Sequence, residues 1–426
     1  MQYFLPDSQD LVDPSFDFEK ETRSPDRVRH RDDRYAHEIF GSRVFDGILV
    51  SKGIVDSSGG TGRYTGPQRR RFDRDGAKRF FRAVRHPWGK LRFMGDCGAF
   101  TYVKEEKPPY SVDEVVEFYV RGKFDLGVSV DHIILTYDPD WDAFGKSSVP
   151  PEILQRQELT LELARDFIKK AKKAGSFTPM GVAQGWSPAS YAHAVKALQK
   201  MGYRYIAIGG VVPLKTHKLI HVLDQVNAVR QARVKLHLLG VTRLEKIADF
   251  RSFGVASFDS TSPLRRAWLD NKVNYYTPDR SYTAIRVPQV DGNVRLQKRI
   301  RAGEVKQEHA LAAETKCLKY LAEFDAGKRS ERSVLKALTE YERIHDPGGD
   351  RSEVYREVLA DRPWKACKCE VCVGLGHHVI LFRGAERNRR RGFHNIGVFY
   401  QQLKQELARP KRRTPAREPE QRVLSV

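Results

Sequence analysis

Three cysteines lie within six residues near the C-terminal end of the chain, as Cys367-x-Cys369-x-x-Cys372. Thiolates this close in sequence can converge on one tetrahedral metal ion, with a histidine as the fourth ligand. Three histidines follow and are candidates for that position: His377, His378 and His394. A redox pair is the weaker interpretation, because the three cysteines would then need separate reasons. The pattern favours a Cys₃His zinc site, which would be structural because the protein supplies all four ligands.

Three aspartates follow apolar runs that resemble strands: Asp96 in GDCGAF, Asp138 in TYDPD and Asp259 in SFDST. Each one alone could be a helix cap, a turn former or an ion-pair partner. Together they suit glycosidic chemistry, in which one carboxylate attacks the anomeric carbon and another moves the proton of the leaving group. A divalent-metal site for phosphoryl transfer is the rival interpretation.

Glycines occupy further strand ends, at Gly185 after Gln184 and at Gly209-Gly210. Without a side chain, they would let backbone amides approach a planar ligand. Simple turn geometry is the alternative explanation.

Short apolar runs alternate with longer helical patterns along much of the chain, and these elements would position the polar residues. Strands are expected at 46–50, 91–94, 132–136, 180–183, 205–208, 236–239 and 255–258. Successive βα units imply a parallel sheet, either doubly wound or closed. We expect an α/β protein with a (β/α)₈ TIM barrel, because the notable polar residues follow strands whose ends converge on one face in a barrel.

The remaining segments predict appendages to this barrel. The expected order is an N-terminal arm (1–45), the barrel (46–290), a helical insertion (291–362), a zinc-binding subdomain (363–402) and a basic disordered tail (403–426). Residues 57–71 are glycine-rich and then basic, which indicates a loop. Its arginines suit phosphates, although a solvated surface loop fits equally well.

The chain has 426 residues and a net charge of +21, which suggests a polyanionic partner such as nucleic acid. Hydrophobic residues make up 40%, enough to exclude a mainly disordered chain. No run approaches the roughly 20 apolar residues of a membrane-spanning helix, and the start of the chain lacks the features of a secretory signal. Five cysteines are too few for a disulfide scaffold. We therefore expect a cytoplasmic protein.

The motifs, in their order and spacing, resemble those of the tRNA-guanine transglycosylase (queuine/archaeosine) superfamily, over about 46–274 and 367–400. GDCGAF resembles the family's SDSGGF, GVAQG resembles GIVQG, and LLGV resembles LMGV. TYDPD, AIGG, SFD and the C-x-C-x-x-C…HN pattern also have family counterparts. Departures include Thr101 in place of a glutamine and Leu239 in place of the usual methionine.

The resemblance implies a role for each matched residue. Asp96 would be the general acid/base and Asp259 the nucleophile. The exchanged base would lie against the following residues: Asp138, Gln184, Gly209, Gly210 and Leu239. Among the three histidines, the resemblance selects His394. The zinc ligands would then be Cys367, Cys369, Cys372 and His394.

FLPDSQD, DGILVSKGIVD and the helical block are similar to the DNA-acting branch, the DpdA-type DNA-guanine transglycosylases. This resemblance implies exchange of guanine in DNA for the 7-deazaguanine base 7-cyano-7-deazaguanine (preQ0), by double displacement through a covalent Asp–sugar intermediate. It also implies a DNA-modification system of the restriction–modification type, with further partner proteins.

A tRNA substrate is the first alternative, because a basic protein attracts tRNA and DNA alike. A non-catalytic partner subunit is the second, and the two retained aspartates argue against it. Phosphate contacts are predicted for four arginines: Arg265, Arg266, Arg389 and Arg390. For the run 387–391, a solvated helix face is the competing interpretation.

Overall fold

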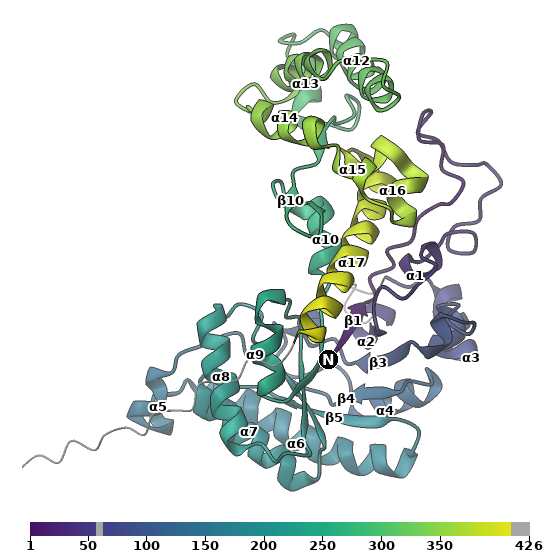
Figure 1. Cartoon of the computed structure of the whole chain (residues 1–426). Helices are drawn as coiled ribbons and strands as arrows, with labels where there is room; N and C mark the ends of the chain where they lie inside the picture. Colours follow the sequence, from purple (N-terminus) through teal and green to yellow (C-terminus); the bar gives the residue numbers. More distant parts are fainter. Residues whose placement is uncertain (57–62, 410–426) are drawn as a thin grey trace, which may run out of the picture.

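The computed structural model describes residues 1–56 and 63–409. Eight parallel strands close into a barrel in chain order (Figure 1). The strands are β1 (Gln2–Pro6), β2 (Gly47–Ser51), β3 (Arg92–Asp96), β4 (Leu126–Val128), β5 (Thr178–Ala183), β6 (Tyr205–Ile208), β7 (Lys235–Leu238) and β8 (Val255–Asp259). Closure occurs at β1, where Phe4 is in register with Gly47 of β2 and Asp259 of β8. The predicted (β/α)₈ barrel is confirmed.

The barrel interior is a separate apolar cluster that includes Phe4, Leu49, Met94, Met180 and Val182. Alternate residues of each strand point inward, so bulky side chains from neighbouring strands stack in layers and fill the barrel. The polar side chains at the carboxyl ends of the strands therefore lie above a solid floor.

Two expectations about the strands are wrong. The first strand, β1, lies within the predicted N-terminal arm. Its five residues show too little alternation of apolar and polar side chains for the sequence to indicate a strand there. The fourth strand is Leu126–Val128, and residues 132–136 form no strand. Ile133 and Ile134 are nevertheless buried, so that apolar run reflects packing and not strand pairing.

Helices surround the barrel: α1 (Ala36–Ile39), α2 (Lys52–Val55), α3 (Gly66–Phe80), α4 (Val112–Arg121), α5 (Asp140–Phe144), α6 (Pro151–Ala174), α7 (Pro188–Met201), α8 (Thr216–Val229), α9 (Ile247–Ser252) and α10 (Ser262–Leu269). α3 contains the basic part of the predicted loop at 57–71, because Thr65 and Gln68 form a capping box that starts a helix there. Residues 57–62 of that loop lie outside the described residues.

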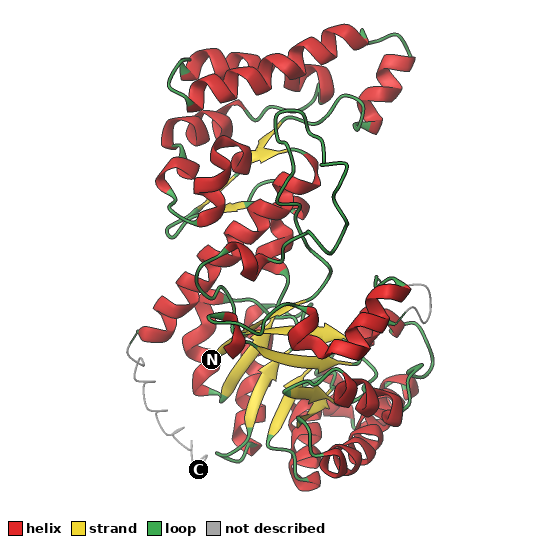
Figure 2. Cartoon of the chain, turned by 90° about the vertical axis from the view of Figure 1, so that its right-hand side faces the viewer, coloured by secondary structure: helices red, strands yellow, loops and turns green. Residues whose placement is uncertain are grey.

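A second body contains α11 (Val294–Arg301), α12 (Gln307–Asp325), α13 (Glu331–His345) and α14 (Ser352–Asp361), all within the range 291–362. Two short helices follow, α15 (Pro363–Ala366) and α16 (Glu370–Leu375). Four short strands form two small sheets: β9 (Tyr275–Tyr276) pairs antiparallel with β10 (Ser281–Tyr282), and β11 (Ile285–Arg286) pairs parallel with β12 (Leu381–Phe382). Figure 2 shows the barrel and the helical body at opposite ends of the molecule.

The long helix α17 (Gly384–Ala408) runs between these two bodies (Figure 1). It packs tightly against α10, since a Cβ at Gly392 would lie 2.7 Å from the Leu264 carbonyl oxygen. Residues 403–408 belong to α17, so the predicted boundary of the disordered tail at residue 403 falls inside this helix. Residues 410–426 of that tail lie outside the described residues. Within the described part of the chain, no helix is both long enough and apolar enough to cross a bilayer.

Candidate active site

Asp96 and Asp259 are the last residues of β3 and β8, at the same rim of the barrel. The Asp96 carboxylate accepts hydrogen bonds from Ser51 Oγ (2.7 Å) and the Gly98 amide (2.9 Å). Burial, together with the negative charge of Asp259, nevertheless raises the pKa of Asp96 to about 6. A carboxyl group with this pKa can give up or take a proton near neutral pH.

The Asp259 side chain is almost completely buried and is held through one of its two oxygens. Oδ1 accepts hydrogen bonds from His237 Nε2 (3.1 Å) and from the Gly240 amide (3.1 Å). His237 belongs to β7, and Gly240 follows that strand, so the neighbouring strand supplies both donors. Sequence patterns do not single out His237, because it lies inside an apolar strand.

A third buried carboxylate, Asp131, lies beside Asp96. Its Oδ2 accepts a hydrogen bond from Gln184 Nε2 (2.7 Å), and its Oδ1 accepts one from Cys97 Sγ (3.1 Å). Burial and the charge of Asp96 raise the pKa of Asp131 to about 7. The sequence pattern does not indicate Asp131, because a strand at 132–136 would begin just after this residue. The observed strand β4 ends three residues before Asp131 and so places it at the rim.

Asp138, the residue predicted to bind the base, has different contacts. Its Oδ1 accepts a hydrogen bond from the Asp140 amide (3.1 Å), at the start of α5. Its own amide donates to the Trp186 carbonyl (2.8 Å), and its side chain is half-buried. These are the contacts of a turn-forming aspartate. Asp131, and not Asp138, forms the hydrogen bond with Gln184 in this structure.

Gly209 and Gly210 surround the Gln184 side chain. A Cβ at Gly209 would lie 2.3 Å from Gln184 Nε2, and one at Gly210 would lie 2.2 Å from the Ile134 carbonyl oxygen. Gly210 also has φ +72°, which favours glycine. The two glycines therefore allow Gln184 to reach Asp131. Leu239 is half-buried and packs on top of the apolar floor of the barrel.

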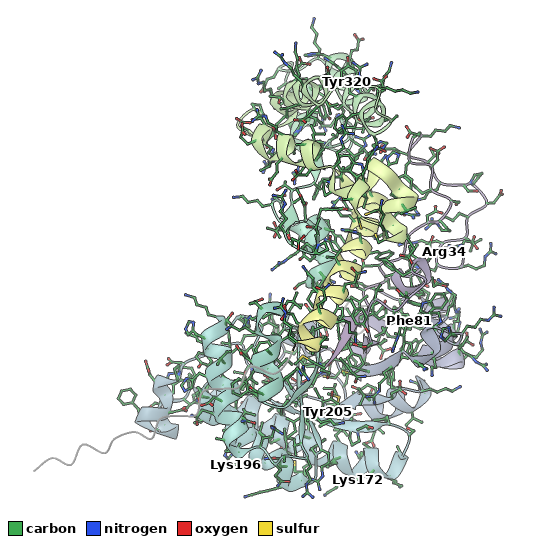
Figure 3. All side chains as sticks on the ribbon, in the orientation of Figure 1. Arg34, Phe81, Lys172, Lys196, Tyr205 and Tyr320 are labelled. Atoms are coloured by element: carbon green, nitrogen blue, oxygen red, sulfur yellow. The ribbon has the colours of Figure 1, made fainter. Side chains whose placement is uncertain are left out.

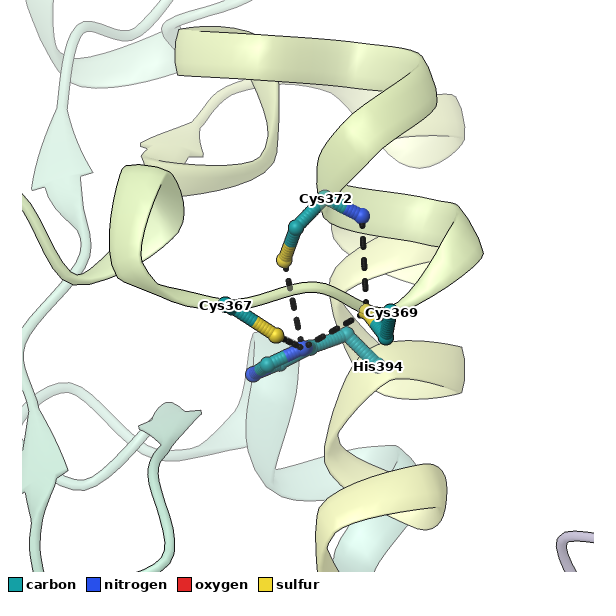
Figure 4. Close-up of side chains that lie close together, drawn as sticks. All are labelled: Cys367, Cys369, Cys372 and His394. Carbon is teal, nitrogen blue, oxygen red and sulfur yellow. Dashed lines mark hydrogen bonds between the residues drawn. The ribbon is translucent and has the colours of Figure 1, made fainter.

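The four predicted metal ligands converge (Figure 4). The Sγ atoms of Cys367, Cys369 and Cys372 lie 3.7, 3.4 and 3.3 Å from His394 Nδ1. A tetrahedral Zn²⁺ with Zn–S of about 2.3 Å and Zn–N of about 2.0 Å has S···N edges of about 3.5 Å. The donor set and its spacing therefore fit a tetrahedral metal ion.

The surroundings of His394 also fit a metal ligand. Its Nε2 forms a 2.7 Å hydrogen bond with the Tyr276 carbonyl, which places the proton on Nε2 and leaves Nδ1 free to bind a metal. The Tyr275 ring stacks on the imidazole, with the two ring centroids 4.2 Å apart. His377 and His378, the other candidates, instead lie beside Glu19 and form a separate group with it.

The four arginines predicted to contact phosphates lie in two different settings. On α17, Arg390 donates to the Asp13 carbonyl (2.6 Å), and Arg389 lies 3.4 Å from the Leu11 carbonyl. These two side chains hold the N-terminal segment against α17 instead of forming an open basic face. On α10, Arg265 is half-buried and Arg266 is exposed. Arg266 lines a cavity of about 510 Å³ that also contains Arg243.

Two carboxylates at the open rim of a parallel barrel, with a third beside a primary amide, suit the transfer of a glycosyl group between bases. The fold and this rim have the features expected of a barrel glycosyltransferase.

No family model matches the chain. It is 47% identical over 413 residues to a DNA-guanine transglycosylase of Salmonella montevideo, and the match covers 96% of this chain and 98% of that protein. The chain belongs to the guanine transglycosylase family.

Proposed function

We propose that the protein exchanges guanine in DNA for a 7-deazaguanine base within a DNA-modification system. The incoming base that we propose is preQ0. The observation that carries the choice of DNA is the near full-length similarity to a relative that is named for acting on DNA. The net charge of +21 suits that polyanion. The identity of the base, the restriction–modification setting and the partner proteins rest on the family resemblance.

The reaction would proceed by double displacement. The target nucleotide leaves the base stack, because C1′ and the base edge cannot be reached inside a duplex. An oxygen of Asp259 bonds to C1′ as the C1′–N9 bond breaks, and Asp96 gives its proton to the departing guanine. Asp96 then takes a proton from the incoming base, whose nitrogen bonds to C1′ and releases Asp259. The pKa of about 6 supports this double role for Asp96.

Asp131 and Gln184 would recognise the base. The Watson–Crick edge of guanine presents N1–H and N2–H₂ as donors, which match the two oxygens of Asp131. The O6 atom of guanine is an acceptor, and the side-chain amide of Gln184 can donate to it. We therefore assign base recognition to Asp131 in place of Asp138. Gly209, Gly210 and Leu239 would shape the floor beneath the base.

The metal ion would be Zn²⁺, as the three thiols and one imidazole favour. When bound, it would cross-link the segment around α15 and α16 to α17. The chain's own contacts carry this link to the barrel, because Phe399 of α17 packs against Tyr3 of β1 with ring centroids 5.1 Å apart. Tyr400 also donates to Asp46 Oδ1 (2.6 Å), just before β2.

The DNA backbone would pass the cavity that contains Arg266 and Arg243, with Arg265 beside it. Its walls include Thr242 after β7 and Ser262 at the start of α10, and these segments follow the strands that carry His237 and Asp259. A phosphate bound there would lie next to the nucleotide that enters the barrel rim. Since Arg389 and Arg390 hold the N-terminal segment, they are weaker candidates for phosphate contacts.

The test is incorporation of radiolabelled guanine or preQ0 by the purified protein into duplex DNA and into tRNA, with Asp259→Asn as control. We expect label in DNA, an enzyme–DNA adduct that survives denaturation, and neither signal with the variant. Label in tRNA alone would contradict the choice of polymer. An active Asp259→Asn protein would contradict the assignment of the nucleophile.

A further inference from the structure

Beneath the rim, a line of buried polar side chains ends on Asp259. Tyr205 of β6 lies in the barrel (Figure 3), and its hydroxyl is 2.5 Å from Ser257 Oγ of β8. Ser257 Oγ is in turn 2.5 Å from His237 Nδ1 of β7, and His237 Nε2 is 3.1 Å from Asp259 Oδ1. His237 and Ser257 are completely buried, and Tyr205 is 6% exposed. A polar line inside an otherwise apolar barrel requires a reason, because each unpaired member would cost free energy.

The donors along this line can be assigned from its two ends. The Asp259 carboxylate only accepts, so His237 must carry a proton on Nε2 to bond with it. A neutral imidazole then has a lone pair on Nδ1, which accepts from the Ser257 hydroxyl. Ser257 Oγ accepts from the Tyr205 hydroxyl. In this order every hydrogen bond is satisfied, and the line points at the carboxylate.

Both bonds to the carboxylate fall on the same oxygen. The Gly240 amide also donates to Oδ1, from 3.1 Å, and across residues 1–56 and 63–409 these are the two hydrogen bonds that the Asp259 carboxylate accepts. Two donors on Oδ1 fix the rotation of the carboxylate and leave Oδ2 to approach C1′. In a glycosyl-enzyme bonded through Oδ2, Oδ1 would be the ester carbonyl oxygen. The same donors would then stabilise the charge that returns as Asp259 leaves.

We infer that His237, oriented by Ser257 and Tyr205, is a positioning residue that holds the Asp259 carboxylate for attack and assists its departure. This inference rests on the proposed function, because it assumes that Asp259 is the nucleophile. His237 itself need not touch DNA or base. Its loss should therefore slow the chemical steps and leave the affinity for DNA unchanged.

The test compares His237→Leu with His237→Gln. The glutamine amide can place an N–H near the position of imidazole Nε2, whereas leucine is similar in bulk and has no donor. Formation of the denaturation-resistant adduct, and its breakdown by added base, would be followed in single turnovers, with DNA affinity and thermal midpoint measured alongside. We expect His237→Leu to slow both steps about 10²-fold, with Kd for DNA unchanged within about twofold. His237→Gln should recover at least tenfold of that loss.

Wild-type rates in His237→Leu would overturn the inference, as would equal losses in the leucine and glutamine variants at equal thermal midpoints. If His237→Leu does not fold, Ser257→Ala decides the question, because it removes only the hydroxyl that orients the imidazole. It should slow adduct formation about tenfold, and an unchanged rate would refute the inference. Adduct formation by Asp259→Asn would instead refute the underlying function, so the two failures are distinguishable.

Discussion

Asp131 and Gln184 are 53 residues apart in sequence, and the side-chain amide of Gln184 donates a 2.7 Å hydrogen bond to the Asp131 carboxylate. The bond joins the segment after β4 to the end of β5, and both residues are buried. This hydrogen bond fixes the orientation of the Gln184 side-chain amide, including its second N–H group. A planar base that enters the rim would meet this preformed donor and acceptor pair.

The first prediction separates Asp131 from Asp138. Asp131→Asn replaces one of the two acceptor oxygens with an NH₂ group that would face a guanine donor, so kcat/KM for guanine exchange should fall about 10²-fold, equivalent to about 2–3 kcal/mol. Asp138→Asn is the matched control, because asparagine can still bond to the Asp140 amide and activity should stay within about twofold. Steady-state exchange assays check both variants. The opposite order would return base recognition to Asp138.

A second prediction concerns the pH dependence of Asp96. Its pKa of about 6 means that the proton needed by the departing guanine is lost as pH rises through 6. Adduct formation in single turnovers should therefore decline above that pH. The Ser51 hydroxyl stabilises the ionised form, so Ser51→Ala should move this decline to higher pH by roughly 0.5 to 1 unit.

Thr101→Ala is the control for that experiment. It removes a nearby hydroxyl that bonds to the Gly98 carbonyl and not to Asp96. Its pH profile should match that of the wild type. A decline that stays in place in Ser51→Ala would show that another group supplies the proton.

The third prediction tests the metal cluster. Cys369→Ser should lower the bound zinc, measured by elemental analysis, and reduce the thermal midpoint, because one of four ligands is lost. Amide exchange in α17 should increase, since His394 would no longer be held to the cysteine segment. Cys317→Ser is the control: Cys317 is buried in α12 outside the cluster and should leave the zinc content unchanged. Full zinc content in Cys369→Ser would contradict the ligand assignment.

The fourth prediction concerns acid stability. Glu21 is partly buried, which raises its pKa, but hydrogen bonds to Arg383 and Gln289 and the charges of Arg383 and Arg387 outweigh this and lower it to about 2. A folded-state pKa below the usual 4.5 gives stability that is present above pH 4.5 and lost as pH falls towards 2.

Glu21→Gln should therefore lower the free energy of unfolding by about 2 kcal/mol at pH 7. The difference from the wild type should shrink steadily below pH 4.5, as measured by urea unfolding. Glu19→Gln is the control, because Glu19 is exposed and its loss should change little. A difference that does not vary with pH would show that the charge of Glu21 is not the cause.

Much of the site could be predicted from local sequence. Cys367, Cys369 and Cys372 are close in the chain, so short-range geometry already indicates a shared metal ion. Asp96 and Asp259 each end a recognisable strand, and a barrel brings all such ends to one rim. The carboxylate pair therefore followed from the fold class, and the family motifs then separated His394 from the other two histidines.

Tertiary structure decided what depends on where strands begin and end. β4 has only three residues, too few for alternation to mark its end. The sequence therefore points to Asp138 as the residue that binds the base, whereas in the structure Asp131 forms the hydrogen bond with Gln184. The closure of the barrel by β1 could not be predicted either, because that strand has only five residues. The charges on α17 suggested a basic face, but the packed N-terminal segment occupies Arg389 and Arg390. His237 contacts Asp259 only because strand register pairs His237 with Ser257, and Asp259 follows two residues later on the same face of β8. Register is a property of the closed barrel and not of any single segment.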